Sequence, residues 1–302
     1  MRYVFIINPT AGKGKQQPII AEAIKNYFKD SKSEYKILFT ESRFDATKKA
    51  KAEAEKGDEV YIFACGGEGT GFEIINGIVG YDNVTYGVIP CGSANDFLKF
   101  FGHKDAFLDI ADQVSGKAID IDLIKADDCY CINGCSIGMD AMVASDMIKF
   151  KDWPLVNGPM AYKLAIVKTF MKKLGVQMEI LLDGISIGHK NCLFAVVANA
   201  PYYGGGYNAA PSAVPFDGKL NFTLVDVISK LKVPGFLAKY ELGLHKSLDY
   251  CHTRECSSMD IIANKPLPIN LDGEIVYKDK IHFEIVKKGI KFLLPKSLIS
   301  QM

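Results

Sequence analysis

Before Gly116 the chain alternates between short apolar runs and segments with helical periodicity. Apolar runs of this length predict buried strands, whereas apolar residues that recur every three or four positions predict helices. The predicted strands are Tyr3–Ile7, Tyr35–Phe39, Glu59–Cys65 and Thr85–Ile89, and the predicted helices include Pro18–Phe28 and Asp45–Glu55. Because strands that alternate with helices usually pair in parallel, this part of the sequence predicts an α/β domain with a parallel sheet.

Three glycine-rich turns directly follow predicted strands, at Asn8–Gly14, Gly66–Thr70 and Pro90–Asp96. Glycine lets backbone N–H groups approach an anion closely, and the positive end of a following helix adds to the attraction. The carboxyl ends of neighbouring parallel strands lie at one edge of a sheet, so the three turns together predict a phosphate site. One such turn alone would be ordinary loop chemistry. Neither a GxxxxGK(S/T) P-loop nor a GxGxxG motif after the first strand occurs.

After Gly116 the pattern changes to short β-rich runs separated by Gly, Pro, Asn and Asp, and the last of these predicted strands is Lys280–Val286. This pattern predicts a β-sandwich-like second domain, so we divide the chain into residues 1–118 and 119–302. One alternative for this division is that the last strand returns to the first domain. Helices are predicted at Pro159–Leu174 and Pro234–Leu244. The first carries an apolar face and four lysines; packing against the second domain is favoured over docking on a membrane.

Composition excludes several classes of protein. The net charge is +1 with dispersed Lys and Arg, which argues against a nucleic-acid partner. No apolar run approaches the length that spans a bilayer, so we expect a cytoplasmic protein, with peripheral membrane association as an option. The cluster Cys129, Cys131 and Cys135 has spacings that fit a zinc site poorly, and reduced core thiols are expected.

Six motifs together resemble the diacylglycerol kinase catalytic-domain family, which bacterial lipid kinases, sphingosine kinases and ceramide kinases share. They follow the order and spacing of that family over almost the whole chain. The motifs are INPTAGKGK (Ile7–Lys15), CGGEGTGFEIINGI (Cys65–Ile78), GVIPCGSANDFLK (Gly87–Lys99), GCSIGMDAMV (Gly134–Val143), ANAPYYGGGYNAAPSAVPFDGKL (Ala198–Leu220) and LDGE (Leu271–Glu274).

The resemblance implies an ATP- and Mg²⁺-dependent lipid kinase that phosphorylates a hydroxyl of a lipid such as diacylglycerol at the membrane surface. ATP would bind the first domain and the lipid would be reached from the second, at an interdomain cleft. The residues implied to contact the nucleotide are Asn8, Gly12, Thr40, Gly66, Gly67, Glu68, Gly69, Thr70 and Ser93, with Asn95 and Asp96 helping to shape the cleft. The implied general base is Glu274, with Asp272 beside it; without the resemblance, this DGE would be an ordinary hairpin turn.

The chain departs from the family pattern at three positions. Glu68 replaces an Asp that reaches Mg²⁺ through water, Phe72 replaces an Asn, and Ser93 replaces a Thr. Mg²⁺ is strict about ligand distances, so the longer Glu68 side chain could change metal affinity or rate.

The resemblance also implies a structural Mg²⁺ in the second domain. Its ligands would be the Asp217 carboxylate and the carbonyl oxygens of Val214 and Lys219. From the residues alone, a tight turn is the favoured interpretation of this segment.

Two alternatives stay open at this stage. One is a NAD kinase-like enzyme, which shares the GGDGT-type turn, although the NPTAGKGK start and the late LDGE belong to the lipid branch. The other is a catalytically impaired lipid- or nucleotide-binding protein, suggested by Glu68 and Phe72. The acceptor lipid is undetermined, and a homodimer is one of the arrangements left open.

Overall fold

The computed structural model describes residues 1–92, 95–151, 153, 160, 164–165, 168–169 and 174–300. Ser93 and most of the predicted helix Pro159–Leu174 therefore lie outside the described residues. The chain forms two compact units, one made of Met1–Leu123 with Val286–Met302 and the other of Ile124–Ile285. Within the described ranges, no helix is long and apolar enough to cross a membrane.

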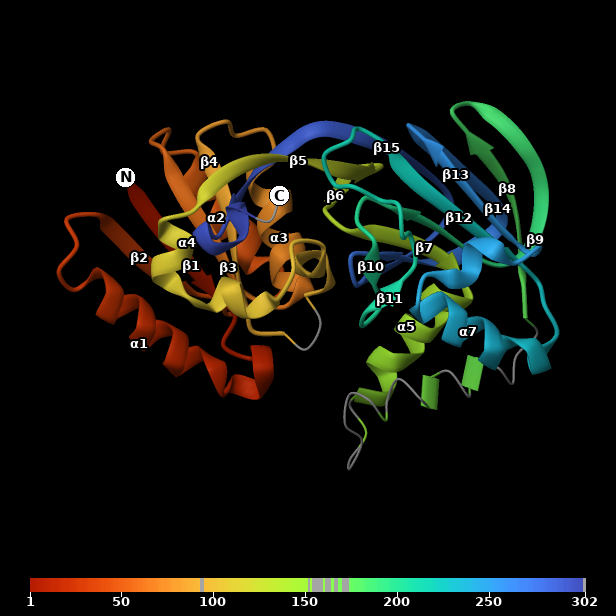
Figure 1. The fold of residues 1–302 in the computed structure, drawn as a ribbon, viewed down its shortest axis with the longest axis horizontal. Coiled ribbons are helices and arrows are strands. Elements are labelled where there is room, and N and C mark those ends of the chain that lie inside the picture. Colours follow the sequence, from red (N-terminus) through yellow and green to blue (C-terminus); the bar gives the residue numbers. More distant parts are fainter. Residues whose placement is uncertain are drawn as a thin grey trace. The chain divides into compact units, whose positions relative to one another are not determined.

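The first unit is a parallel sheet with helices on both faces (Figure 1). Its strands lie in the order β2, β1, β3, β4, and the end of β15 pairs in parallel with β4 through Lys291 and Phe292. The strands are β1 (Arg2–Ile7), β2 (Glu34–Phe39), β3 (Val60–Gly66), β4 (Val84–Pro90) and β15 (Glu274–Leu294). The helices are η1 (Ala11–Gly14), α1 (Gln16–Phe28), α2 (Asp45–Ala54), α3 (Glu68–Ile78), η2 (Asp96–Phe100), η3 (Lys104–Leu108), α4 (Ile110–Val114) and α8 (Lys296–Ile299).

β1 is buried on both faces, as expected of a central strand in a parallel sheet. Its alternate residues Tyr3, Phe5 and Ile7 pack against the apolar stripe of α1. The ring of Phe5 stacks on that of Phe63 in β3, with 4.6 Å between centroids. Full burial of one such aromatic side chain stabilises the fold by about 1.5–3 kcal/mol, so this layer fixes the strand ends that carry the glycine-rich turns.

The second unit is built on antiparallel strands in the order β13, β12, β9, β7, β14, β15, with β8 pairing with both β9 and β14 (Figure 1). Its strands are β5 (Lys117–Ala126), which begins in the first unit, β6 (Cys129–Cys131), β7 (Gly134–Gly138), β8 (Val176–Leu182), β9 (Ile185–Ala198), β10 (Tyr202–Tyr203), β11 (Tyr207–Asn208), β12 (Leu220–Asp226), β13 (Cys251–Cys256) and β14 (Ser258–Leu271). Its helical segments include α5 (Met139–Lys151), η4 (Lys230–Lys232), α7 (Val233–Glu241) and η5 (Leu244–Ser247).

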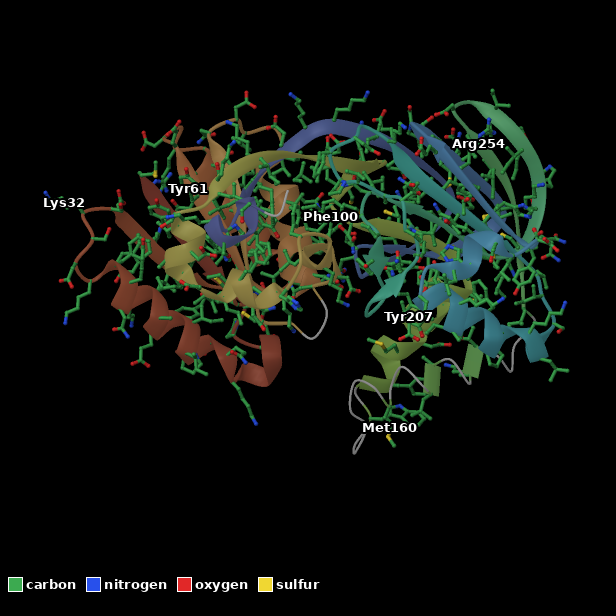
Figure 2. The ribbon with its side chains drawn as sticks, viewed as in Figure 1. Lys32, Tyr61, Phe100, Met160, Tyr207 and Arg254 are labelled. Atoms are coloured by element: carbon green, nitrogen blue, oxygen red, sulfur yellow. The ribbon has the colours of Figure 1, made fainter. Side chains whose placement is uncertain are left out.

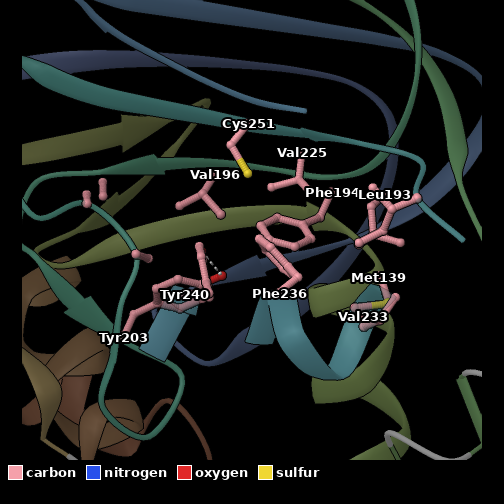
Figure 3. Close-up of a cluster of buried hydrophobic side chains, with 14 of the residues drawn as sticks. Met139, Leu193, Phe194, Val196, Tyr203, Val225, Val233, Phe236, Tyr240 and Cys251 are labelled. Atoms are coloured by element: carbon pink, nitrogen blue, oxygen red, sulfur yellow. Dashed lines mark hydrogen bonds between the residues drawn. The ribbon is translucent and has the colours of Figure 1, made fainter. Parts of the chain in front are cut away.

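One face of this antiparallel sheet packs against α7 through an aromatic cluster (Figure 3). The ring of Phe194 in β9 contacts Phe236 and Tyr240 of α7, with centroid distances of 5.9 and 5.4 Å. Within the cluster the hydroxyl oxygens of Tyr203 and Tyr240 lie 3.2 Å apart and share a hydrogen bond. The structure is thus a mixed α/β fold with a large share of sheet, and its second half is mainly strand (Figure 2).

Candidate functional site

The three glycine-rich turns come together in the first unit, beyond the carboxyl ends of β1, β3 and β4. The Cys91 N–H donates to the Gly66 carbonyl oxygen at 3.0 Å, which ties the third turn to the second. The Asn8 side chain ties the first turn to the second, because its Nδ2 donates to Thr70 Oγ1 at 3.2 Å. Asn8 Oδ1 in turn accepts from the Thr10 hydroxyl at 2.8 Å.

Glycine is required on steric grounds where these turns meet. A β-carbon on Gly92 would lie 2.8 Å from the α-carbon of Gly67, and one on Gly66 would collide with the Thr70 side chain. Gly12 has φ +61°, and a β-carbon there would lie 2.9 Å from the Cys91 carbonyl oxygen. Glycine is therefore needed at these positions for the turns to pack this closely, and backbone N–H groups without side chains around them suit an anion.

Helix α3 adds its positive end to the same place. It begins at Glu68, directly after the N-cap residue Gly67, so the first-turn N–H groups, which have no acceptor within the helix, belong to the GGEGT segment. The partial positive charge of a helix N-terminus favours phosphate.

Acidic and amide oxygens line the third turn. Glu68 Oε1 accepts a hydrogen bond from the Asp96 N–H at 2.9 Å. Asp96 itself is fully buried, and its Oδ1 lies 2.8 Å from Lys99 Nζ. The sequence could not show the Glu68 contact, because it depends on how two separate turns approach each other.

Asn95 is the second buried polar residue of this turn. It has φ +55°, and its Nδ2 donates to the Gly66 carbonyl oxygen at 3.3 Å. The residue is 6% exposed, and its Oδ1 has no hydrogen-bond partner among the described residues. An orphaned oxygen of this kind usually marks a ligand, an ion or a water. Together with two carboxylates it offers the hard oxygen ligands that Mg²⁺ prefers, so these residues fit an ATP–Mg²⁺ complex.

Thr40 and Phe72 have different surroundings in the first unit. The Thr40 N–H donates to the Ile7 carbonyl oxygen at 2.9 Å, which sets this half-buried residue at the end of β2, beside the first turn. The Phe72 side chain is buried in α3 and contributes to the core.

In the second unit, Asp272 clamps a neighbouring loop. Its carboxylate accepts hydrogen bonds from the N–H groups of Ile132, Asn133 and Gly134, with shortest distances of 2.5, 3.2 and 2.8 Å. Burial raises the pKa of the Asp272 carboxyl to about 6, although the three backbone donors oppose the rise. The sequence alone did not indicate this structural role, since the loop is far away along the chain.

Glu274 begins β15 on the far side of the same turn, where it pairs with Leu271 of β14. The turn is closed by the Gly273 N–H, which donates to Asn270 Oδ1 at 2.7 Å. The DGE motif is therefore a hairpin turn, and it sets Glu274 half-buried at the first position of the strand.

The second unit contains a buried series of hydrogen-bonded polar side chains that the sequence does not indicate. The Ser136 hydroxyl donates to the Asp140 carboxylate at the start of α5, and burial raises the pKa of Asp140 while hydrogen bonds from Ser136 and Tyr203 oppose the rise. Tyr203 continues the series to Tyr240 (Figure 3). Its members come from separate elements, so no spacing in the sequence announces it.

The segment with Asp217 forms a tight turn. Asp217 Oδ1 accepts from the Lys219 N–H at 3.0 Å, and the Val214 carbonyl oxygen accepts from the N–H groups of Phe216 and Asp217 at 2.8 and 3.3 Å. Both lone pairs of the Val214 oxygen are thus engaged, which fits poorly with a direct Mg²⁺ bond. Among the described residues there is no group of three His, Cys, Asp or Glu side chains suited to a metal.

Comparisons with known proteins agree with this arrangement. The diacylglycerol kinase catalytic domain matches residues 2–126, and the YegS C-terminal NAD kinase beta sandwich-like domain matches residues 133–293. The Bacillus subtilis protein named diacylglycerol kinase is 28% identical over 306 residues, which cover 98% of this chain and 97% of the relative. A Shewanella frigidimarina protein named probable lipid kinase YegS-like is 28% identical over 238 residues, covering 76% of this chain and 75% of the relative.

A solved structure supports the fold. The crystal structure of a diacylglycerol kinase from Bacillus anthracis str. Sterne superposes with a TM-score of 0.70 at 19% identity, covering 99% of this chain and 98% of that one. At this level of identity the likeness concerns the fold alone.

Proposed function

The chain belongs to the diacylglycerol kinase catalytic-domain family, and from this premise we propose that it transfers the γ-phosphate of ATP to a hydroxyl of a membrane lipid such as diacylglycerol. The observation that carries the proposal is the meeting of three glycine-rich turns at the ends of β1, β3 and β4. Glycine backbone, which carries no side chains, suits a triphosphate when it lies next to a helix N-terminus. The family names among the relatives support a kinase of the lipid kinase type.

Phosphoryl transfer depends on alignment and on neutralising charge, and the proposed roles follow from this requirement. ATP bound with Mg²⁺ would supply the phosphoryl group. The turns Asn8–Gly14 and Gly66–Thr70 would hold its phosphates, with Thr40 beside them. Asn95 Oδ1 and the carboxylates of Glu68 and Asp96 would hold the hydrated cation.

Glu274 is the proposed general base, which accepts the proton of the attacking lipid hydroxyl. A half-buried carboxylate at a strand start is held in place by the sheet and still accessible to substrate. Ser93 stays a predicted nucleotide contact, and the Mg²⁺ at Asp217, Val214 and Lys219 stays a prediction.

A second candidate function, nucleotide binding without efficient transfer, is favoured by one observation. Glu68 stands where the family pattern has Asp, and its carboxylate bonds the Asp96 N–H. This contact draws on an oxygen that a cation-binding carboxylate would use. Restoration of transfer in the double variant Glu68→Asp, Phe72→Asn would support this second candidate.

The test is a transfer assay with γ-labelled ATP and a panel of acceptors, read by chromatography of the products. The panel contains diacylglycerol, monoacylglycerol, a sphingoid base, an undecaprenyl-type alcohol and NAD. We expect label in a lipid product. Label in NADP alone would reject the lipid kinase proposal in favour of a NAD kinase.

A further inference from the structure

Helix α7 buries one side and exposes the other. Val233, Phe236 and Tyr240 recur at spacings of three and four residues, and their side chains enter the aromatic cluster of the second unit (Figure 3). An α-helix has about 3.6 residues per turn, so the opposite side carries Ala238 and the C-cap residue Leu242. These two positions are exposed.

Large apolar side chains are exposed at both ends of this helix. Leu231, in the η4 turn that leads into α7, is 94% exposed. Leu242 and Leu244, which follow the helix, are 67% and 57% exposed. A single exposed leucine needs no explanation, but three within one short segment, with one almost fully in solvent, indicate an interaction surface.

Lysines surround these leucines. Residues 230–246 contain four lysines and a single carboxylate: Lys230, Lys232, Lys239, Lys246 and Glu241. The first three lysines are exposed and form no ion pair with any described residue. Lys246 Nζ donates to the Ser212 hydroxyl at 2.7 Å, a neutral partner, so its charge is not compensated by that contact. The segment therefore joins apolar tips to an excess of positive charge.

We infer that this α7 surface, defined as Leu231, Leu242, Leu244 and the four lysines, docks the chain onto a bilayer that contains acidic lipids. The leucines would enter the headgroup region, and the lysines would lie against the lipid phosphates. A bilayer with acidic headgroups suits this surface, because exposed leucines and lysines whose charge is not compensated occur together in one short segment. The inference goes beyond the proposed transfer reaction, since docking needs neither ATP nor a lipid acceptor.

The test is sedimentation of the full-length chain with vesicles, without nucleotide or diacylglycerol. We expect binding to vesicles of equal parts phosphatidylcholine and phosphatidylglycerol, little binding to pure phosphatidylcholine, and weaker binding as salt rises. Leu231→Gln should lower the affinity for vesicles about tenfold, because the variant loses the free energy gained when an exposed leucine side chain moves out of water. Lys230→Gln and Lys232→Gln should each lower it about fivefold.

Ile185→Gln is the matched control, since Ile185 is 66% exposed in the same unit but outside the α7 surface. It should bind like the wild type. Equal losses in Ile185→Gln and Leu231→Gln, wild-type affinity in Leu231→Gln, or no binding of the wild type to acidic vesicles would each overturn the inference. So would a dimer in solution that Leu231→Gln converts to a monomer, because the surface would then belong to a second copy.

A parallel assay separates this inference from the kinase proposal. Transfer from ATP to a water-soluble, short-chain diacylglycerol is measured on the same variants without vesicles. The α7 variants should keep wild-type transfer while losing vesicle binding. If no variant transfers phosphate but vesicle binding still depends on Leu231, the kinase proposal fails and the docking inference stands.

Discussion

The carboxylate of Glu68 accepts a hydrogen bond from the backbone N–H of Asp96, with 2.9 Å between Oε1 and the nitrogen. The contact joins the first residue of α3 to the turn that follows β4, so it holds two of the three glycine-rich turns together. An Asp at position 68 would be one methylene shorter and would reach this N–H only if one of the turns moved. The departure from the family pattern thus has a defined structural consequence.

Removing this acceptor should destabilise the first unit. Glu68→Ala leaves the Asp96 N–H without its charged partner and should lower the free energy of unfolding by about 1–2 kcal/mol. Glu68→Gln keeps an amide oxygen at the same reach, so the loss should stay below about 1 kcal/mol. Urea denaturation followed by circular dichroism measures both values. Equal losses in the two variants would show that the hydrogen bond is not what Glu68 contributes.

Two glycines of the same site should respond differently to an added methyl group. A β-carbon at Gly92 would lie 2.8 Å from the α-carbon of Gly67, whereas one at Gly67 would lie 3.6 Å from the α-carbon of Gly92, an ordinary contact. Gly92→Ala should therefore lower the free energy of unfolding by about 1–3 kcal/mol, because backbone must move. Gly67→Ala should fold with nearly wild-type stability. Thermal unfolding of both variants decides this, and a larger loss in Gly67→Ala would contradict the geometry.

Sequence patterns located β1, β2, β3 and β4 well, because each is a short apolar run, and three of the four end at a glycine-rich turn. They were less informative about β15, which the sequence indicated only over Lys280–Val286, whereas the strand runs over Glu274–Leu294. The polar residues Lys287 and Lys288 interrupt the apolar pattern there. Lys288 has φ +52°, and its N–H donates to Asp122 Oδ1 at 2.8 Å. The strand therefore continues past an irregular position at which the apolar pattern of the sequence stops.

The family resemblance, which rests on six motifs, is confirmed by the two domain matches. The site itself was predictable only in part. Glycine-rich turns after strands announce that a site exists, since their chemistry is local. Contacts such as that between Glu68 and Asp96, or between Asp272 and the N–H groups of 132–134, join residues far apart in the chain. Only the packed structure brings such partners together, so periodicity cannot reveal them.

Glu274→Gln should abolish transfer of phosphate to lipid while leaving the fold intact. The amide cannot accept the proton of the attacking hydroxyl, so transfer should fall at least about a hundredfold, the usual contribution of a general base. Asp279→Asn is the matched control, because Asp279 is an exposed carboxylate of the same strand. The labelled-ATP assay measures transfer, and circular dichroism checks the fold. Wild-type transfer in Glu274→Gln would remove this residue from the mechanism.

Asp272 should make stability depend on pH in the sense opposite to that of an ordinary ion-paired carboxylate. Burial raises its pKa to about 6 in the folded chain, from the ordinary value of 3.8 for an Asp carboxyl. Between these two pH values the folded state binds more protons than the unfolded state, so the stability that Asp272 contributes should fall as pH rises from about 4 to about 6. Above pH 6 both states are ionised and the contribution should be constant.

The comparison with Asp272→Asn isolates this effect, because the amide does not titrate and keeps one oxygen for the N–H groups of 132–134. The difference in free energy of unfolding between wild type and variant is measured by urea denaturation at a series of pH values. The free energy of unfolding of the wild type, relative to that of the variant, should fall by up to about 1.4 kcal/mol per pH unit between about pH 4 and pH 6. Above pH 6 the difference should stay constant. A difference that instead moves in favour of the wild type as pH rises would mean that the three backbone donors outweigh burial, and that Asp272 is an ordinary ionised clamp.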